Sequence, residues 1–348
     1  MTTRRSFLRS ALALPALSTF GALHAGPGFA QAPDAARKLT VGVGGFTFAY
    51  LPLFVADAAG LFREEGLDVS LVQTGSGTTA MAAMLGGSFQ VTGLVLSDVI
   101  MAASKGQQIT VFAPLMTQYA SDAIISKAAA ERVGITPDMP LPERLKRLKG
   151  LTLAVSGRGS GIDKMWRYLL RSVDLDPDKD VTLTVIKLDQ MYPALRAGQI
   201  DGYNTTAPSN NRAVQEGLAV WVARPSQGEV PGLENFVYTT LAVNPDYLKA
   251  NRETLAIFTR GLARGLNLLH ADPVRAAKAV HAKIWAQTDF DLLLAAVQDQ
   301  LSAFAPRMGL TEAAFDQNRD FMLKFGDDVR SVKYGSVIDA SLIEAVSL

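Results

Sequence analysis

The stretch Leu39–Gly77, LTVGVGGFTFAYLPLFVADAAGLFREEGLDVSLVQTGSG, decides the fold. The apolar run Leu39–Val43 stops at two glycines, which is typical of a buried parallel strand. A helix is expected to follow, with Pro52 at its first position, where the missing N–H of proline does no harm, and with a left-handed glycine, Gly60, at its end. Leu67–Val72 is a second strand. The stretch therefore predicts a βαβ unit whose loops lie at the carboxyl edge of a sheet, where ligands bind in open α/β folds.

The same plan recurs in the second half of the chain. Leu151–Val155 is another apolar run that ends at glycines, here within Gly157–Gly161. A helix is predicted over Ile162–Ser172 and a strand over Val181–Ile186. The repeat indicates an α/β fold with two similar lobes, each a mostly parallel sheet flanked by helices. Because each lobe ends in glycine and serine loops, we predict a ligand cleft between the lobes.

The predicted lobes are not continuous in sequence. We expect the first lobe to comprise residues 38–126 and 236–348, and the second lobe to comprise 127–235. A cluster of glycine and proline precedes Phe236–Val243, the strand predicted to bring the chain back. An all-helical tail follows, and its apolar residues recur at helical spacing, so they are expected to pack on the first lobe. This stripe consists of Leu255, Phe258, Leu262, Leu266 and Leu269.

The composition limits the possible functions. Basic and acidic side chains are nearly balanced, with 34 Lys and Arg against 33 Asp and Glu, so no basic face for nucleic acid is indicated. The chain has no cysteine, which excludes disulfides, thiolate metal sites and a cysteine nucleophile. A hydrophobic fraction of 48% is that of a folded globular protein.

The N-terminal segment, residues 1–32, has the features of a cleavable export signal. Arg4 and Arg5 precede an apolar middle, and Ala30–Ala32 supplies a small-residue cleavage site. The paired arginines resemble the twin-arginine signal. No other stretch has the ~20 continuous apolar residues needed to span a bilayer. We therefore expect a soluble mature protein in the periplasm.

Candidate ligand-binding residues lie in the loops predicted at the two sheet edges. Helix N-termini there carry free N–H groups and a partial positive charge, and small residues let a ligand approach that backbone. Aromatic rings in the first loop are suited to stack on an organic body, and an arginine is suited to pair with an anion. The candidate set is Phe46, Phe48, Tyr50, Ser76, Gly77, Ser97, Arg158, Gly159, Ser160, Gly161, Thr205 and Thr206.

Several candidates have an equally simple structural interpretation. Ser97 and Asp98 are natural N-caps of the helix that follows them. Phe46 and Phe48 suit a hydrophobic core, and Arg158 suits a solvent-facing position. Taken together, the set predicts a small neutral-to-anionic organic ligand, because no acidic cluster indicates a cationic one.

Four segments carry a resemblance to a known family, namely Tyr50–Ala56, Gly60–Phe62, Glu65–Val69 and Leu195–Gly202. They resemble the periplasmic substrate-binding proteins of ABC uptake transporters, in the group that binds nitrate, sulfonates, taurine and pyrimidine precursors of thiamine. The resemblance implies the type II fold of periplasmic binding proteins and closure of two lobes around one small molecule. It also implies a monomer whose partner is an ABC transporter permease in the inner membrane. The family often has an aromatic-acidic pair after the position of Asp201, where this chain has Tyr203–Pro208, so the ligand class stays open.

Two other classes of function fit the same fold. One is an enzyme similar to pyrimidine-precursor synthases, and the other is a ligand sensor for a membrane receptor. Outside the signal only His270 and His281 are present, and HExxH is absent. Gly157–Gly161 matches neither the phosphate loop nor the nucleophile elbow. We therefore predict a binding protein that is not an enzyme and uses no metal or cofactor.

Overall fold

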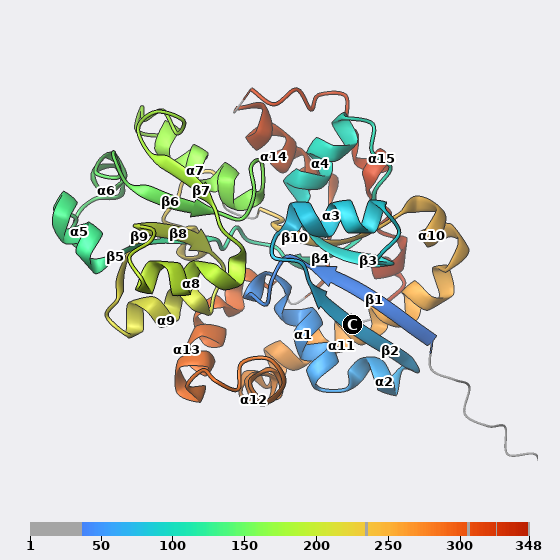
Figure 1. Cartoon of the computed structure of the whole chain (residues 1–348). Helices are drawn as coiled ribbons and strands as arrows, with labels where there is room; N and C mark the ends of the chain where they lie inside the picture. Colours follow the sequence, from blue (N-terminus) through green and yellow to red (C-terminus); the bar gives the residue numbers. More distant parts are fainter. Residues whose placement is uncertain (1–36, 234–235, 305–306, 325, 347–348) are drawn as a thin grey trace, which may run out of the picture. The chain divides into compact units, whose positions relative to one another are not determined.

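The computed structural model describes residues 37–233, 236–304, 307–324 and 326–346. The predicted export signal lies outside the described residues. Within them the chain forms two five-stranded sheets with helices packed on their faces (Figure 1). We use the term first lobe for the sheet that contains β1 and the helices on it, and second lobe for the sheet that contains β6 and its helices.

The first sheet has the strand order β2-β1-β3-β10-β4. β1 runs parallel to β2 and β3, whereas β10 is antiparallel to β3 and β4. All five residues of β10 are buried, as expected for a central strand with both faces covered. The strands are β1 (Arg37–Val43), β2 (Leu67–Gln73), β3 (Val91–Val95), β4 (Thr110–Met116) and β10 (Thr239–Val243).

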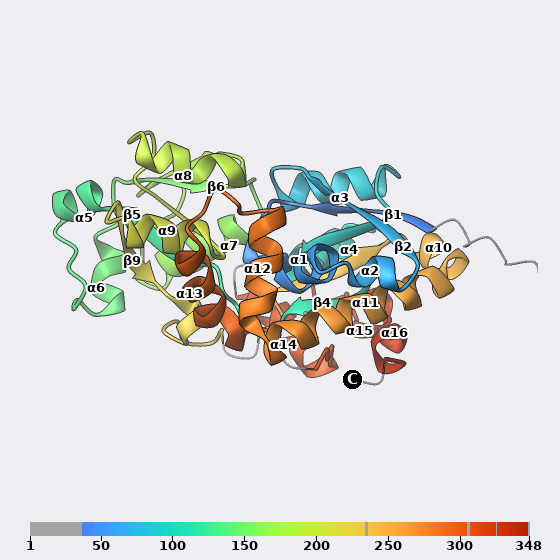
Figure 2. The ribbon, with the colours of Figure 1, turned by 90° about the horizontal axis from the view of Figure 1, so that it is seen from below.

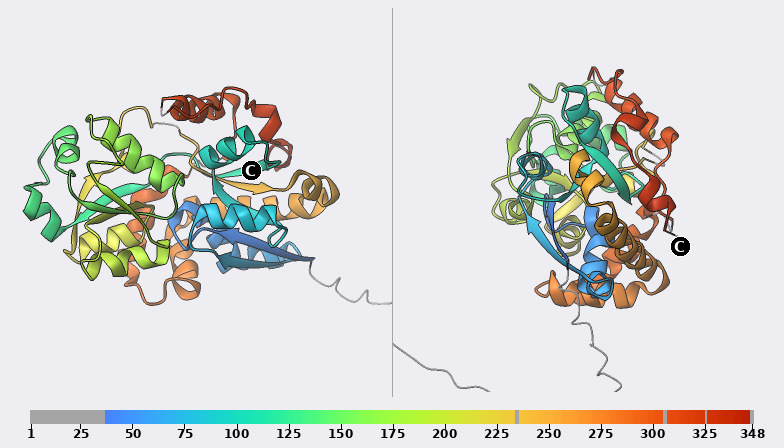
Figure 3. Two further views of the ribbon diagram at one scale, coloured as in Figure 1. Left: turned by 45° about the horizontal axis from the view of Figure 1, so that its top comes forward. Right: turned by 90° about the vertical axis from the view of Figure 1, so that its right-hand side faces the viewer.

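The second sheet repeats this arrangement in the order β7-β6-β8-β5-β9. β6 runs parallel to β7 and β8, and β5 is antiparallel to β8 and β9. Each sheet therefore has one strand that is antiparallel to the other four, β10 in the first sheet and β5 in the second. Both strands follow segments of the chain that cross from one lobe to the other (Figure 3). The strands are β5 (Asp122–Ser126), β6 (Thr152–Val155), β7 (Thr182–Val185), β8 (Gly202–Thr205) and β9 (Ala219–Ala223).

The helices of the first lobe cover both faces of its sheet, with α3 on one face and α1 and α11 on the other (Figure 2). The helices that precede the second lobe in sequence are α1 (Leu51–Ala58), α2 (Leu61–Glu64), α3 (Gly77–Leu85) and α4 (Leu96–Ser104). Those after it are α10 (Pro245–Ala250), α11 (Arg252–Ala271), α12 (Pro273–Lys283), α14 (Glu312–Leu323), α15 (Tyr334–Val337) and α16 (Ser341–Glu344).

In the second lobe, α13 from the C-terminal segment packs against α9. The helices of this lobe are α5 (Lys127–Val133), α6 (Leu141–Lys146), α7 (Gly161–Arg171), α8 (Leu188–Arg196), α9 (Ser209–Gln215) and α13 (Phe290–Gln300). Three short 3-10 helices complete the described elements, namely η1 (Phe48–Tyr50), η2 (Pro225–Gln227) and η3 (Leu301–Ala303).

The predicted apolar stripe of the tail is confirmed as core. All five of its members lie on α11 and are buried. Phe258 stacks on Phe62 of α2, with ring centroids 4.8 Å apart. α11 approaches α1 so closely that a Cβ at Gly265 would lie 2.6 Å from the carbonyl oxygen of Pro52. The tail is therefore part of the first lobe through packing that requires glycine at this contact.

Three local predictions need correction. Ser97 is not a helix cap, because α4 already begins at Leu96 and its N-cap is Val95. Pro52 is the second residue of α1, which begins at Leu51. The predicted first lobe includes Asp122–Ser126, but this strand pairs with β8 and β9 of the second sheet. The second sheet thus begins at Asp122, the first residue of β5. The predicted limits of the lobes as a whole stay a prediction.

Candidate functional site

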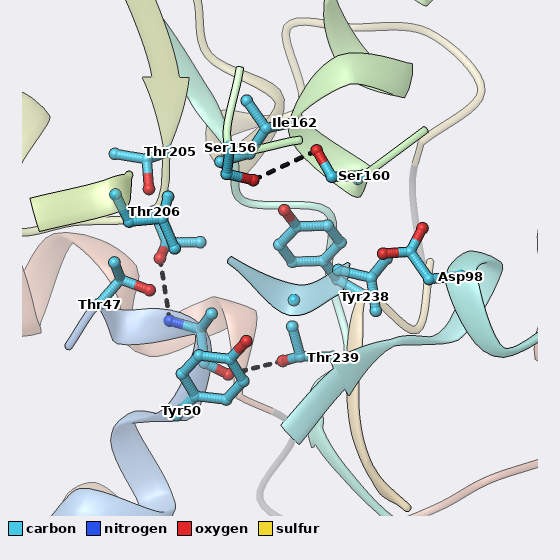
Figure 4. Close-up of a pocket in the computed structure, with 15 residues that line it drawn as sticks. Thr47, Tyr50, Asp98, Ser156, Ser160, Ile162, Thr205, Thr206, Tyr238 and Thr239 are labelled. Carbon is cyan, nitrogen blue, oxygen red and sulfur yellow. Dashed lines mark hydrogen bonds between the residues drawn. The ribbon is translucent and has the colours of Figure 1, made fainter. Parts of the chain in front are cut away.

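A small pocket lies where the loops of the two sheets meet (Figure 4). Its volume is about 40 Å³, which holds only a few water-sized groups. Both lobes line it, and hydroxyl-bearing side chains dominate the lining. The lining residues are Thr47, Ala49, Tyr50, Gly77, Val95, Asp98, Ser156, Ser160, Gly161, Ile162, Leu188, Thr205, Thr206, Tyr238 and Thr239.

The starts of four helices converge on this pocket. Tyr50 is the N-cap of α1 and Val95 is the N-cap of α4. Gly77 and Gly161 are the first residues of α3 and α7. Each of these starts presents N–H groups that have no partner within the helix and the positive end of the helix dipole. The backbone around the pocket therefore favours a ligand with hydrogen-bond acceptors or negative charge.

The two glycine starts share one local design. Ser76 caps α3 by accepting a hydrogen bond from the N–H of Thr79 at 3.1 Å, and Ser160 caps α7 by accepting one from the N–H of Asp163 at 3.3 Å. In both cases a serine cap is followed directly by glycine as the first helical residue. A Cβ at Gly161 would lie 3.0 Å from the Cγ2 of Val95, across the pocket on the other lobe. Glycine at this position thus permits the close approach of the two lobes.

Hydrogen bonds hold several of the lining hydroxyls in place. The hydroxyl of Thr206 accepts from the N–H of Ala49 at 2.9 Å, and that of Thr239 donates to the carbonyl of Ala49 at 2.6 Å (Figure 4). Ser156 donates to the hydroxyl of Ser160 at 3.2 Å. The bonds of Thr206 and Thr239 join residues from distant parts of the sequence. The pocket is therefore pre-organised by tertiary contacts.

Two buried tyrosines line the pocket. Burial raises the pKa of Tyr50 to about 12, opposed by a hydrogen bond from Gly44 and reinforced by the charge of Asp98. Burial also raises the pKa of Tyr238 well above its ordinary value. Both phenols are protonated at neutral pH, as tyrosine ordinarily is, and can donate a hydrogen bond. Gly93 makes room for Tyr50, since a Cβ there would lie 2.5 Å from the tyrosine ring.

One ion pair borders the pocket. The Oδ1 of Asp98, on α4, lies 2.8 Å from the Nζ of Lys164, on α7, and both side chains are largely buried. Among the described residues that line the pocket, Asp98 is the single carboxylate, and no lysine or arginine is present. A ligand in the pocket would therefore meet neutral donors, helix starts and one carboxylate that already has a counter-ion.

Direct contacts join the lobes around the pocket. The N–H of Phe48 donates to the carbonyl of Ala207 at 2.7 Å, and the N–H of Leu188 donates to the carbonyl of Gly75 at 3.1 Å. The hydroxyl of Tyr119 donates to the carbonyl of Gly161 at 3.0 Å. The pocket is therefore covered on more than one side.

The structure places half of the predicted binding residues in this pocket. These are Tyr50, Gly77, Ser160, Gly161, Thr205 and Thr206. Their role in binding stays a prediction.

The other predicted residues lie elsewhere. Phe48 is fully buried against Trp285, and Phe46 packs edge-on against Phe54. Arg158 donates to the carbonyl of Leu183 at 2.9 Å. Ser76 is the N-cap of α3 and does not line the pocket. Ser97 is buried in the first turn of α4, and Gly159 lines a separate outer cavity.

Sequence reasoning missed four prominent lining residues, Thr47, Asp98, Tyr238 and Thr239. Asp98 has a signal in the sequence, because it follows a buried strand at a predicted helix start, but the same position also suits an N-cap. Tyr238 and Thr239 lie at the start of the predicted return strand. Their approach to the pocket depends on the pairing of β10 with β3 and β4, which a repeat-based argument does not contain.

The two histidines of the described residues both bond backbone carbonyl groups outside the pocket. His270 bonds the carbonyl of Phe304 at 2.8 Å, and His281 bonds the carbonyl of Thr288 at 2.8 Å. Within the described ranges, no group of three or more His, Asp or Glu is arranged to hold a metal ion. Nor does the described part of the chain contain a helix with the length and apolar character of a membrane span.

Comparisons with known proteins give a consistent result. The model of the NMT1-like family matches residues 32–286. YtlA of Bacillus subtilis (strain 168), named as a candidate binding protein, is 24% identical over 305 residues, which cover 86% of each chain.

Two solved structures share the fold. The alkanesulfonate-binding protein SsuA of Xanthomonas axonopodis pv. citri, bound to MOPS, has a TM-score of 0.68 at 18% identity and covers 89% of this chain and 99% of its own. The periplasmic nitrate-binding protein NrtA of Synechocystis PCC 6803 has a TM-score of 0.68 at 13% identity, with 90% and 88% covered. These likenesses establish the two-lobed fold of periplasmic binding proteins.

Proposed function

The chain belongs to the NMT1-like family, and from this premise we propose that it is the solute-binding component of an ABC uptake transporter. It captures a small neutral-to-anionic organic molecule in the periplasm and presents it to a membrane permease. The observation that carries the proposal is the convergence of four helix starts and several buried hydroxyls, contributed by both lobes, on one pocket.

The chemistry of the pocket selects a ligand rich in acceptor oxygens. The backbone N–H groups at the starts of α3 and α7, together with the phenols of Tyr50 and Tyr238, are donors. Donors of this kind stabilise sulfonate, nitrate, carboxylate or carbonyl oxygens. The apolar side chains of Val95, Ile162 and Leu188 line the remaining wall and suit a short organic body. With a volume of about 40 Å³, the pocket suits a compact ligand.

Closure of the lobes retains the ligand. The crossing strands β5 and β10 join the lobes, so rotation about the segments next to them opens and closes the pocket. A ligand that contacts both Gly77 and Gly161 binds the closed arrangement better than the open one, and this difference shifts the population. The permease then distinguishes loaded from empty protein by the arrangement of the lobes.

The site is suited to binding without chemistry. Among the lining residues of the described chain, no histidine or lysine lies next to a serine or threonine hydroxyl in the way that an activated nucleophile requires. The hydroxyls of Thr206 and Thr239 already bond the backbone of Ala49. We therefore assign this protein the role of a carrier that releases its ligand unaltered.

The test is to identify the ligand on the exported protein. Native mass spectrometry of the purified mature chain should reveal a bound small molecule. A panel of nitrate, taurine, alkanesulfonates, short carboxylates and pyrimidines should contain compounds that raise the melting temperature, because a ligand that binds only the folded state stabilises it. Thr205→Val in the pocket should reduce the rise, whereas Thr182→Val, an exposed position on β7, should not.

Two results would contradict the proposal. One is the absence of any copurified molecule together with no thermal shift across the panel. The other is conversion of a bound compound to a product by the purified protein.

A further inference from the structure

The ion pair between Asp98 and Lys164 has features that the binding of a ligand does not require. It connects α4 of the first lobe with α7 of the second, with 2.8 Å between Oδ1 and Nζ. The exposed fractions of the two side chains are 6% and 11%. Most other ion pairs of the described chain have at least one exposed side chain or join residues of the same lobe. Burying two charges costs desolvation free energy that only their close pairing offsets. A buried pair between the lobes therefore favours the arrangement in which the lobes are in contact.

We propose that the Asp98–Lys164 pair is a latch that holds the two lobes together over the pocket even without ligand. Its consequence for ligand release rests on the proposed binding function, whereas the latch itself is a property of the ligand-free protein. Each lobe supplies one charge, so the pair forms only when the lobes approach each other.

The first lobe prepares the negative partner. Asp98 lies in the first turn of α4, where the helix dipole favours a carboxylate. Its Oδ2 lies 4.0 Å from the position of a Cβ on Gly77, the first residue of α3. Two helix starts thus face this carboxylate. The open protein would hold the Asp98 side chain close to its latched position, which lowers the entropic cost of forming the pair.

The second lobe prepares the positive partner. Lys164 lies in the first half of α7, next to Asp163. The Oδ2 of Asp163 is engaged by the N–H of Gly159 at 2.8 Å and by the Nε of Arg167 at 3.0 Å. Asp163 is therefore held within its own lobe, and the carboxylate of Asp98, on the other lobe, lies within salt-bridge distance of Lys164.

The pair also lies between two cavities. Asp98 lines the inner pocket, whereas Lys164 lines an outer cavity of about 320 Å³. Met101 of α4 and the C-cap residue Lys105, together with Gly159 and Arg167 of the second lobe, contribute to this outer cavity. The latch therefore lies between the inner pocket and the outer cavity, on one route that a ligand could take.

The latch can be measured without knowing the ligand. The chain has no cysteine, so the substitutions Ala82→Cys on α3 and Gln190→Cys on α8 provide two unique sites for spin labels at exposed positions on opposite lobes. Distances between the labels are measured by pulsed electron resonance on protein freed of copurifying small molecules, as checked by native mass spectrometry. Short distances report closed molecules and long distances report open ones.

We expect closed molecules to predominate in the labelled protein that is otherwise unchanged. Lys164→Met should lower the ratio of closed to open molecules about tenfold or more, because it leaves the Asp98 charge without its partner on closure. Asp98→Asn should have a similar effect, and combining the two should add little, because both remove the same contact. Lys164→Arg, which keeps the charge, should retain a closed majority. Lys146→Met, at an exposed pair within the second lobe, is the matched control and should change nothing.

The proposal is overturned if ligand-free protein is mainly open before any change to the pair. It is equally overturned if Lys164→Met and Asp98→Asn leave the distances unchanged, or if Lys146→Met opens the protein as much as Lys164→Met does. These outcomes do not bear on whether a ligand binds, which the mass spectrometry of copurified molecules decides separately.

Discussion

The two lobes are built on the same plan and differ in the side chains that they present. In both, a parallel strand ends in a glycine loop, a serine caps the next helix and a glycine is its first residue, as in Ser76–Gly77 and Ser160–Gly161. The first lobe adds Tyr50 and Asp98 to the pocket, whereas the second adds Ser156, Thr205 and Thr206. The comparison teaches that the shared backbone supplies the donors, and that the side chains divide shape and charge between the lobes.

The crossing strands extend this comparison. β10 enters the first sheet at Thr239, whose hydroxyl bonds the backbone of Ala49 at 2.6 Å. β5 enters the second sheet at Asp122, a fully buried carboxylate that accepts hydrogen bonds from the N–H of Ser226 at 3.0 Å and from its hydroxyl at 2.6 Å. Equivalent positions in the two lobes thus carry a neutral and an ionisable group. Of these two described positions, the one in the second lobe is the buried acid.

The largest difference is expected between the two glycine helix starts. Gly161→Val places a side chain against Val95, where a Cβ alone already lies 3.0 Å away. Overpacking of this kind costs about 1–3 kcal/mol of stability, and the added methyl groups also fill a pocket of about 40 Å³, so the thermal shift caused by ligand should disappear. Gly77→Ala, whose Cβ meets only Asp98 at 4.0 Å, should fold normally and lose less of the ligand-induced thermal shift than Gly161→Val. An equal loss of the ligand-induced thermal shift in both variants would contradict the expected difference between the two helix starts.

A smaller effect is expected from the buried acid of the second crossing strand. Burial raises the pKa of Asp122 from 3.8 to about 6, while the bonds from Ser226 and the charge of Arg224 oppose the rise. The folded state therefore holds this proton more tightly than the unfolded state does. The stability it contributes is full below about pH 4 and is lost as the pH rises through about 6.

Asp122→Asn removes this dependence. Between about pH 4 and pH 7 the free energy of unfolding of the variant should rise relative to that of the unchanged protein, by on the order of 2 kcal/mol. Urea denaturation at a series of pH values measures the difference. The matched variant at the first crossing, Thr239→Val, should show no such pH-dependent difference, and a pH-independent difference for Asp122→Asn would show that the carboxylate does not titrate in this range.

The smallest effect is expected from the two serine caps. Ser76→Ala and Ser160→Ala should each lower the free energy of unfolding by about 1 kcal/mol, the usual cost of losing an N-cap. Both should also weaken ligand binding, because the glycines that follow lie in the pocket. Ser126→Ala is a control, since this serine caps α5 by accepting from the N–H of Ala129 at 3.1 Å away from the pocket. It should cost similar stability and leave binding unchanged. Weakened binding in all three variants would mean that general destabilisation is responsible.

The fold was predictable because its signals are local and repeated. The apolar run Leu39–Val43 and its counterpart Leu151–Val155 lie within β1 and at β6, and the tail stripe from Leu255 to Leu269 is buried on α11. The site was predictable only in part. Helix starts such as Gly77 and Gly161 follow from the strand–glycine–helix pattern, but Phe48 and Phe46 look the same in sequence whether they face a ligand or the core.

The amino-acid sequence by itself determined the two α/β repeats, the apolar faces that build each lobe and the small residues at the helix starts. These depend on spacing, on the lack of a side chain in glycine and on hydroxyl caps, all of which act between near neighbours in the chain. Only the tertiary structure decided that Tyr238 and Thr239 reach the pocket and that Asp98 meets Lys164 across it. The physical reason is that each crossing strand pairs in the sheet of the other lobe, and contacts between residues so distant in sequence leave no periodic pattern along the chain.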